Sequence, residues 1–456
     1  MERKDILGNQ KMSKLLWNLS LPATIAMFVN ALYNIVDTIF IGRGIGYLGI
    51  GGLTIAFPVQ MVIMAIAQMI GIGAASVISR NLGAKNEERA FHVTGNAYLT
   101  VAVLGFLICA FGLIFIDPLL RVFGASAVLF PYAKEYLQVI LVGSIYFPFV
   151  VTCNNLIRAE GNAKVAMFSM MIGAILNIIL DYIFIFPLDL GIRGAALATI
   201  MSQFVSMVYV LSYIYGGQSK LRVKLHHLKP DFKIIYEILT VGFPSFARQV
   251  AGSIIAIIIN NSLGFYGGDL AISVYGVVNR IIMFLFMPLF GIVQGMQPIV
   301  GYNYGAKKFQ RVKEVLKLAV IATTVLATVS TLFGELFPHI IIGLFEDDPL
   351  LINNGVTALR IVISMVPIIG LQIIGAAFFQ SLGKAMPSLL LTLSRQVLFF
   401  IPLVLILPRI NGMGVIGVWL SFPIADVLST VTTVALLKKE MNIINKQEEA
   451  ELKLAS

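Results

Sequence analysis

Two aspartates of this 456-residue chain stand inside long apolar stretches, and each has a carboxamide on the same face of its predicted helix. Asn30, Asn34 and Asp37 are spaced by four and three positions, and Asn177 precedes Asp181 by four. Residues at these spacings share one helix face. Apolar stretches of this length can cross a membrane. A charge at the centre of a bilayer costs roughly 2.5–3.5 kcal/mol even on the scale that gives the lowest cost, so such residues normally face a cavity or a partner. We interpret the two carboxylates as functional.

Other polar side chains in the first half of the chain can complete a site around these carboxylates. They are Tyr33 beside Asn34, Asn154 and Asn155 towards the end of one apolar stretch, and Thr199, Ser202 and Ser206 along another. Carboxylate, carboxamide and hydroxyl oxygens form a hard-oxygen ligand set, which suits Na⁺ or an H⁺ held by a carboxylate pair. The alternative is that these residues only join helices by hydrogen bonds.

The composition indicates where these residues lie. Hydrophobic residues make up 58% of the chain and charged residues 12%, with a mean hydropathy of +0.90. A soluble protein averages roughly 45–50% apolar and about 25% charged residues. The balance predicts an all-α integral membrane protein in a lipid bilayer. It excludes a disordered chain and a nucleic-acid binder. A disulfide scaffold is excluded as well, because the chain has only two cysteines, Cys109 and Cys153, and both lie in apolar segments.

Twelve runs are long and apolar enough to cross a bilayer, which takes about 20 residues. They cover approximately residues 15–40, 53–79, 92–116, 130–157, 164–186, 193–215, 235–263, 271–299, 314–337, 351–381, 387–407 and 414–437. Prolines fall within several of them, including Pro148 and Pro367, and permit kinks there.

Lysine and arginine counts predict the orientation of these spans. With the N-terminus in the cytoplasm, 24 of the 33 basic residues lie on the cytoplasmic side, 5 lie on the opposite side and 4 lie inside spans. Cytoplasmic loops of membrane proteins carry the excess of basic residues. We therefore expect both termini in the cytoplasm, with the chain crossing the plasma (inner) membrane of a prokaryote many times.

The two halves of the chain resemble each other at one constant offset in the numbering. LSLPA around Pro22 matches VGFPS around Pro244, and RNLGAKNEERA matches YNYGAKKFQRV at the same offset. A six-helix unit present twice enters the membrane from the same side each time, so the repeats are parallel. We predict an N-lobe over residues 1–215, a basic cytoplasmic linker over 216–233 and a C-lobe with a cytoplasmic tail over 234–456. Two pseudo-symmetric bundles around a central cleft suit alternating access.

The second half lacks the paired aspartates. The positions equivalent to Asp37 and Asp181 are Ile259 and Leu403. A different set of charged residues lies in its spans, namely Arg248, Arg280, Arg360, Arg395 and Asp426. These arginines can pair with the single acid in a charge network, or can extend from helix ends to the interface. We place cation binding in the first half.

Motifs for catalysis, nucleotide binding or a metal centre are absent from the pattern. The pair His226–His227 stands in the basic linker, and we expect it to be a solvated loop feature. Without a nucleotide-binding motif, an ion gradient is the remaining energy source. We expect no enzyme activity, no cofactor and no metal other than a coupling Na⁺. The 18 Met and 31 Phe residues can supply a soft lining for substrates of many shapes.

Several motifs resemble the multidrug and toxic compound extrusion (MATE) family, in particular its DinF-type and MepA-like members. They include GAASVISRNLGAKN after the second span, LIRAEGNAK after the fourth, LNIILDYIFIF in the fifth and GIRGAALATIMSQ in the sixth. The resemblance extends over nearly the whole chain. It implies two six-helix lobes around a cleft and antiport of drugs or organic cations against Na⁺ or H⁺.

The resemblance also implies a coupling site in the N-lobe. In DinF-type members it consists of residues that map onto Asp37, Asn154, Asn177, Asp181 and Thr199. Asn30, Tyr33, Asn34 and Ser202 would form a supporting polar face. The NorM-type branch has acidic cation ligands in helices seven and ten, where this chain carries Arg248 and Arg360, so the sequence does not favour a C-lobe site of that type.

The sequence therefore predicts a secondary active multidrug efflux antiporter that exports small amphipathic or cationic organic compounds and works as a monomer. The alternative transporter is a flippase for a lipid-linked saccharide, for which the second-half arginines could bind pyrophosphate. An intramembrane enzyme or a receptor is a further alternative, but the two aspartates lack the motif context of an intramembrane protease. Composition and motifs do not distinguish Na⁺ from H⁺.

Overall fold

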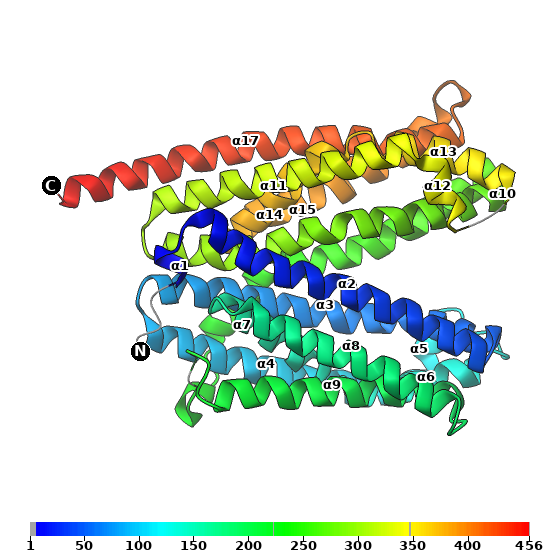
Figure 1. Cartoon of the computed structure of the whole chain (residues 1–456), viewed down its shortest axis with the longest axis horizontal. Coiled ribbons are helices and arrows are strands. Elements are labelled where there is room, and N and C mark those ends of the chain that lie inside the picture. Colours follow the sequence, from blue (N-terminus) through cyan, green and yellow to red (C-terminus); the bar gives the residue numbers. More distant parts are fainter. Residues whose placement is uncertain (1–5, 222, 346–347, 456) are drawn as a thin grey trace. The chain divides into compact units, whose positions relative to one another are not determined.

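The computed structural model describes residues 6–221, 223–345 and 348–455, and all regular secondary structure in these ranges is helical (Figure 1). Residue 222 of the predicted linker, and residues 1–5, 346–347 and 456 of the predicted lobes, lie outside the described residues. The chain forms two compact units. The N-terminal unit is Leu21–Phe246, and the C-terminal unit is Met1–Ser20 together with Ala247–Ser456.

The helices of the N-terminal unit lie mostly within one continuous segment. They are the greater part of α2 (Met12–Gly44), α3 (Tyr47–Gly83), α4 (Glu87–Ile114), α5 (Ile116–Val122), α6 (Phe130–Gly143), α7 (Phe147–Ala159), α8 (Ala163–Ile185), α9 (Gly191–Tyr215), the 3-10 helix η1 (Leu225–Leu228) and the start of α10 (Phe232–Gly305).

The C-terminal unit contains the remaining helices. They are α1 (Ile6–Asn9), the first turns of α2, the main part of α10, α11 (Phe309–Leu336), α12 (Pro338–Gly343), α13 (Pro349–Ile363), α14 (Val366–Ser381), α15 (Ala385–Leu393), the π-helical segment η2 (Ser394–Phe400), α16 (Ile401–Ile406), the 3-10 segment η3 (Leu407–Gly412) and α17 (Val415–Ala455).

The described helices account for all twelve predicted spans. Within the described ranges, nine helices are long and apolar enough to cross a membrane, and two bent helix pairs pass the same test together. One of the nine is α10, which is 74 residues long and is interrupted at Gly268, where φ is +64°. Glycine adopts this backbone conformation without steric cost. The interruption divides α10 into two segments, as the gap between predicted spans 235–263 and 271–299 requires.

Proline accounts for both bent pairs. The fourth span bends by 47° between α6 and α7, and the tenth bends by 49° between α13 and α14. In each case the proline, Pro148 or Pro367, stands at the beginning of the second helix. A proline has no backbone N–H and disfavours helical geometry in the residue before it, so the preceding helix ends and a new one starts.

The internal repeat is visible in the backbone as well as in the sequence. Helices α4 and α11 begin and end at equivalent positions, separated by the same offset as Pro22 and Pro244. Four positions with positive φ recur at this offset, in the pairs Gly46 and Gly268, Lys85 and Lys307, Gly161 and Gly383, and Asp189 and Asn411. The helices and the turns between them therefore follow one pattern in both halves.

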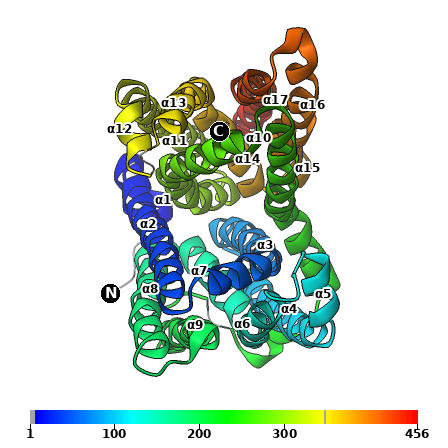
Figure 2. The same cartoon turned by 90° about the vertical axis from the view of Figure 1, so that its right-hand side faces the viewer.

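Close helix packing in the N-terminal unit depends on glycine. Helix α3 packs on α4, α6 and α7 (Figure 2), and the start of α10 crosses α3 at Gly73 and Gly242. A Cβ atom at Gly242 would overlap the carbonyl group of Met69, and one at Gly73 would overlap the carbonyl oxygen of Ile238. Only a residue without a side chain allows the two backbones to approach this closely.

Many large apolar side chains on the outer helix faces stay exposed, including Phe106, Phe111 and Ile114 on α4. A water-soluble protein rarely leaves so much contiguous apolar surface uncovered. These faces fit a lipid environment, in which helices satisfy their own backbone hydrogen bonds.

The borders of the two units differ from those of the predicted lobes. Residues 6–20 associate with the C-terminal unit, where Asn303 Nδ2 donates to the carbonyl oxygen of Leu7 and Gly295 packs closely on Ser20. Residues 234–246 associate with the N-terminal unit through the α3 crossing. Hydropathy delimits spans but carries no information about such contacts between distant segments. The functional division into lobes stays a prediction.

Candidate functional site

Asp37 and Asp181 meet where the second half of α2 lies on α8. Phe40 of α2 contacts the rings of Tyr182 and Phe186, with centroids 6.3 and 5.9 Å apart. The carboxyl groups of Asp37 and Asp181 are within hydrogen-bonding range of each other. The two residues are 7% and 0% exposed. Two carboxylates this close repel each other unless a proton or another cation lies between them.

Asn177 and Thr199 extend the site from α8 to α9, two helices that pack side by side (Figure 1). With the Asn177 amide oriented to satisfy both of its groups, Nδ2 donates to Asp181 Oδ2 at 3.1 Å and Oδ1 accepts from the backbone N–H of Thr199 at 3.3 Å. The i, i+4 spacing of Asn177 and Asp181 is what places both side chains on one face of α8. The fifth and sixth spans thus supply three of the five predicted site residues.

The two adjacent asparagines on α7 have different surroundings. Asn155 donates to Gln68 Oε1 at 3.2 Å and accepts from Arg158 at 3.0 Å, so its side chain holds helices together. Asn154 is also buried, but its Oδ1 has no hydrogen-bond partner among the described residues. Helix α7 packs on both α8 and α9. The available acceptor is therefore on Asn154, which the family resemblance also selects.

Three buried oxygens of the predicted site receive no hydrogen bond from any described residue. They are Asp37 Oδ1, Asp181 Oδ1 and Asn154 Oδ1. No described ion pair involves either aspartate. Buried polar atoms are nearly always paired, and each exception calls for an explanation such as an ion or a functional role. Oxygens of this kind are the ligands that hard cations prefer.

Two neighbouring residues were missed by the sequence analysis. Tyr136 of α6 is buried near Gln60 of α3, and its hydroxyl is close enough to interact electrostatically with Asp37 and Asp181. Tyr33, which the sequence did indicate, interacts with both carboxyl groups as well. Gln60 could have been identified as a candidate site residue because a polar glutamine is unusual inside an apolar span. A tyrosine in a span, such as Tyr136, is only weak evidence for a functional site.

The rest of the predicted polar face is directed elsewhere. Asn34 is exposed, and its Nδ2 donates to the backbone oxygen of Asn30 at 2.7 Å. Ser202 is buried and donates to the backbone oxygen of Thr199 at 2.8 Å. These contacts lie within their own helices, so the structure does not bring Asn30, Asn34 or the Ser202 hydroxyl onto the carboxyl pair.

Among the described residues, the charged side chains predicted in the C-terminal spans do not join into one network. Arg395, in the π-helical segment η2, donates through Nε to Asp426 Oδ1 at 2.6 Å, and Asp426 is buried on α17. Arg360 pairs with Glu335 at 3.5 Å. The Arg248 guanidinium lies 5.7 Å from the ring centroid of Phe290, and Arg280 is exposed. The predicted pairing of an arginine with Asp426 thus applies to Arg395.

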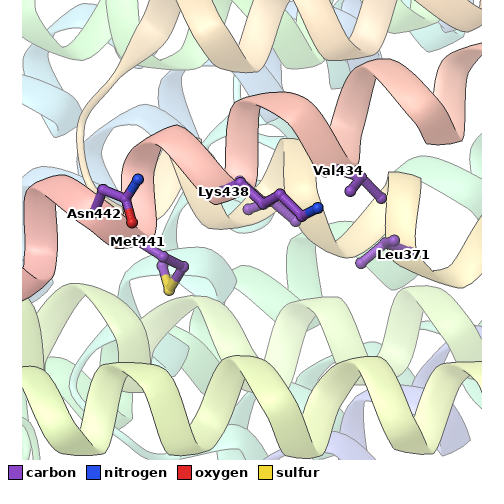
Figure 3. A pocket seen from close by; sticks show the side chains of 6 residues that line it. Leu371, Val434, Lys438, Met441 and Asn442 are labelled. Carbon is purple, nitrogen blue, oxygen red and sulfur yellow. The ribbon is translucent and has the colours of Figure 1, made fainter.

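A cavity of about 380 Å³ lies in the C-terminal unit between α14 and α17 (Figure 3). Its lining consists of Leu371, Val434, Leu437, Lys438, Met441 and Asn442. None of the predicted site residues is among them. We assign no function to this cavity.

The expectation of a solvated histidine pair is wrong for His227. This residue is 1% exposed and packs on α4, where Gly95 leaves room for the His227 backbone. Its neighbours Glu88, His92 and His226 place four potential metal ligands together. The basic composition of the linker suggested a solvated loop. Composition does not reveal that a segment docks onto a helix distant in sequence.

Comparison with known proteins shows the family. The MatE family model matches residues 22–183 and 244–406, two segments whose starting points are separated by the offset of the internal repeat. The chain belongs to the MatE family, whose members are membrane transporters rather than enzymes.

Similar proteins span nearly the whole chain. The multidrug export protein MepA of Staphylococcus aureus (strain MRSA252) is 26% identical over 433 residues, which are 94% of this chain and 95% of that protein. The structure of a ligand complex of the MATE multidrug transporter DinF-BH is 44% identical, with a TM-score of 0.89 over 97% of this chain and 99% of that one. An outward-facing multidrug resistance MATE transporter of the MOP superfamily is 28% identical, with a TM-score of 0.92 over 98% and 99%. The predicted family and twelve-helix fold are confirmed.

Proposed function

We propose that this MatE transporter is a secondary active antiporter that exports amphipathic organic cations in exchange for Na⁺ or H⁺. The observation that carries the proposal is the buried contact between Asp37 and Asp181, together with one oxygen on each of these residues and on Asn154 that no described residue pairs. The names of the multidrug export protein MepA and of the multidrug transporter DinF-BH support the export of organic compounds.

Coupling follows from the electrostatics of the carboxyl pair. Without a cation, the two carboxyl groups must share a proton or repel each other. A proton or Na⁺ from outside relieves the repulsion and favours the arrangement of the lobes in which drug binds weakly. Release of the ion inside restores drug binding. Reciprocal coupling requires only that the ion and the drug prefer different states.

Transport under separately imposed gradients tests this function. In proteoliposomes that contain the purified protein, a pH gradient and a Na⁺ gradient are imposed separately. We expect one of them to drive ethidium counterflow, and that gradient identifies the coupling ion. Equal ethidium movement with no gradient, with either gradient alone and in protein-free vesicles would contradict ion-coupled export. Vesicles with a fluorescent lipid-linked saccharide would test the flippase alternative, for which Arg248, Arg360 and Arg395 give little support because each has a separate contact.

We further propose that both termini and the linker lie in the cytoplasm and that the transporter works as a monomer in the plasma membrane. Leu225 in the linker is 87% exposed and Val122 after the third span is 81% exposed, while both native cysteines are buried. Leu225→Cys should therefore resist an impermeant thiol reagent added to intact cells, and Val122→Cys should react. The reverse labelling pattern would overturn the orientation.

A further inference from the structure

Three of the four histidines of this chain gather with one carboxylate where the linker meets α4. Glu88 and His92 are one turn apart on α4, and His226 and His227 form part of η1. One ligand atom from each residue lies within 4.8 Å of all the others. The fourth histidine, His339, is exposed on α12 in the other unit.

The spacing of these atoms matches a metal site better than a set of hydrogen bonds. Glu88 Oε1 is 3.5 Å from His92 Nε2 and 3.4 Å from His226 Nε2. Charge-assisted hydrogen bonds are shorter, about 2.7–2.9 Å. Ligands bound tetrahedrally at about 2.0–2.1 Å from a zinc ion lie about 3.3 Å from one another. The ligand atoms of His92 and His226 lie within 4.8 Å of each other, so these two rings would move closer together around an ion to complete such a site.

The hydrogen bonds of His227 give it a different role from the other two histidines. Its Nδ1 accepts from the backbone N–H of Lys224 at 2.9 Å, so in the neutral ring the proton is on Nε2. That Nε2 lies 3.0 Å from Glu88 Oε1 and can donate to it. A ring in this tautomer cannot ligate a metal through Nε2, but it can orient the carboxylate. Such outer partners are typical of protein metal sites.

We propose that Glu88, His92 and His226 bind a Zn²⁺ ion, with His227 as the residue that positions Glu88 and with water completing the coordination. Two imidazoles and one carboxylate suit Zn²⁺ and related transition metals. Glu88 and His226 are exposed enough for an ion to enter from solution. The neighbouring Arg89 is paired with Glu237 at 3.0 Å and so does not compete for Glu88.

The site is held in place by contacts that do not involve the ligands. Asn96 of α4 donates to the backbone oxygen of Lys229 at 3.2 Å and accepts from the backbone N–H of Asp231 at 2.8 Å. The ring of His227 also contacts Phe91, with centroids 5.6 Å apart. The linker is therefore docked on α4 before a metal binds, and the ion would fasten it further.

Zinc titration of purified, tag-free protein tests the site, with free Zn²⁺ reported by a competing chromophoric chelator. We expect one ion per chain for the wild type and for the control His339→Ala. We expect weaker Zn²⁺ binding in the double variant His92→Ala/His226→Ala and, separately, in Glu88→Gln. Loss of a residue that only positions a ligand typically lowers metal affinity about 10–100-fold, and each of these variants should lower it further. Glu88→Gln nearly preserves shape, so it separates loss of a ligand from loss of fold.

A second measurement reports on the linker directly. Zn²⁺ should slow tryptic cleavage at Lys224 and Lys229 in the wild type and in His339→Ala, but not in the double histidine variant. Wild-type protein that binds no stoichiometric Zn²⁺, or histidine and Glu88 variants that bind as tightly as the wild type, would overturn the proposal. The readouts do not depend on transport, so the outcome is independent of the proposed antiport.

Discussion

Asp37→Asn and Asp181→Asn are each expected to reduce ion-driven ethidium efflux to the level of protein-free vesicles. Asparagine has nearly the volume of aspartate, so the packing between α2 and α8 should persist. It cannot ionise, however, so the variant keeps only one of the two carboxyl groups. The repulsion and proton sharing that couple the pair to a cation are then lost, and one of the two negative charges that balance a bound Na⁺ is missing. Efflux from proteoliposomes under the gradient that drives the wild type measures the effect.

Asp426→Asn is the matched control, because it removes a buried carboxylate from the other unit. Asparagine at this position can still accept a hydrogen bond from Arg395, so transport should continue at a reduced or similar rate. Removal of one partner from a buried ion pair is expected to lower thermal stability. If Asp426→Asn stopped transport while both N-terminal variants pumped at the wild-type rate, the site in the N-terminal unit would be wrong.

Gly242→Ala should strongly destabilise the N-terminal unit. The added Cβ would overlap the carbonyl group of Met69, with its carbon only 2.7 Å away, so the crossing of α3 and α10 must open. Overpacking typically costs about 1–3 kcal/mol and occasionally more, and a clash with backbone belongs at the upper end of that range. The melting temperature of purified protein in detergent should fall by several degrees.

Gly252→Ala provides the control for this experiment within the same helix. A Cβ at Gly252 meets no atom of a described residue within 4 Å, and alanine is favoured over glycine in a helix by up to about 1 kcal/mol. Its melting temperature should equal or slightly exceed that of the wild type. Equal melting temperatures for both variants would show that the backbones of α3 and α10 do not approach closely at Gly242.

The fold was largely predictable because its determinants are local or periodic. Apolar runs delimit the spans. The internal sequence repeat corresponds to a repeat in backbone conformation, because Lys85 and Lys307 stand at equivalent positions and both have positive φ. Pro148 and Pro367 lie where their spans bend, and a proline limits helical geometry wherever it occurs in a sequence. The membrane removes most alternatives, since spanning helices must satisfy their own backbone groups.

The candidate site was predictable in part. Helical spacing placed Asn177 with Asp181, and the structure joins them. Spacing within one helix cannot identify partners on other helices, so Tyr136 was missed and Asn34 was included although it is exposed. The docked linker illustrates the same limit, because the contact of His227 with Glu88 joins two segments that are far apart in the chain.

The most direct test of the central claim is the release of the coupling ion on substrate binding. Saturating ethidium added to detergent-purified protein in weakly buffered solution should displace either protons, followed by a pH indicator, or Na⁺, followed as bound radioactive sodium. We expect release by the wild type and by Asp426→Asn, and none by Asp37→Asn or Asp181→Asn. Release of the same amount by all four proteins would contradict an ion site at Asp37 and Asp181.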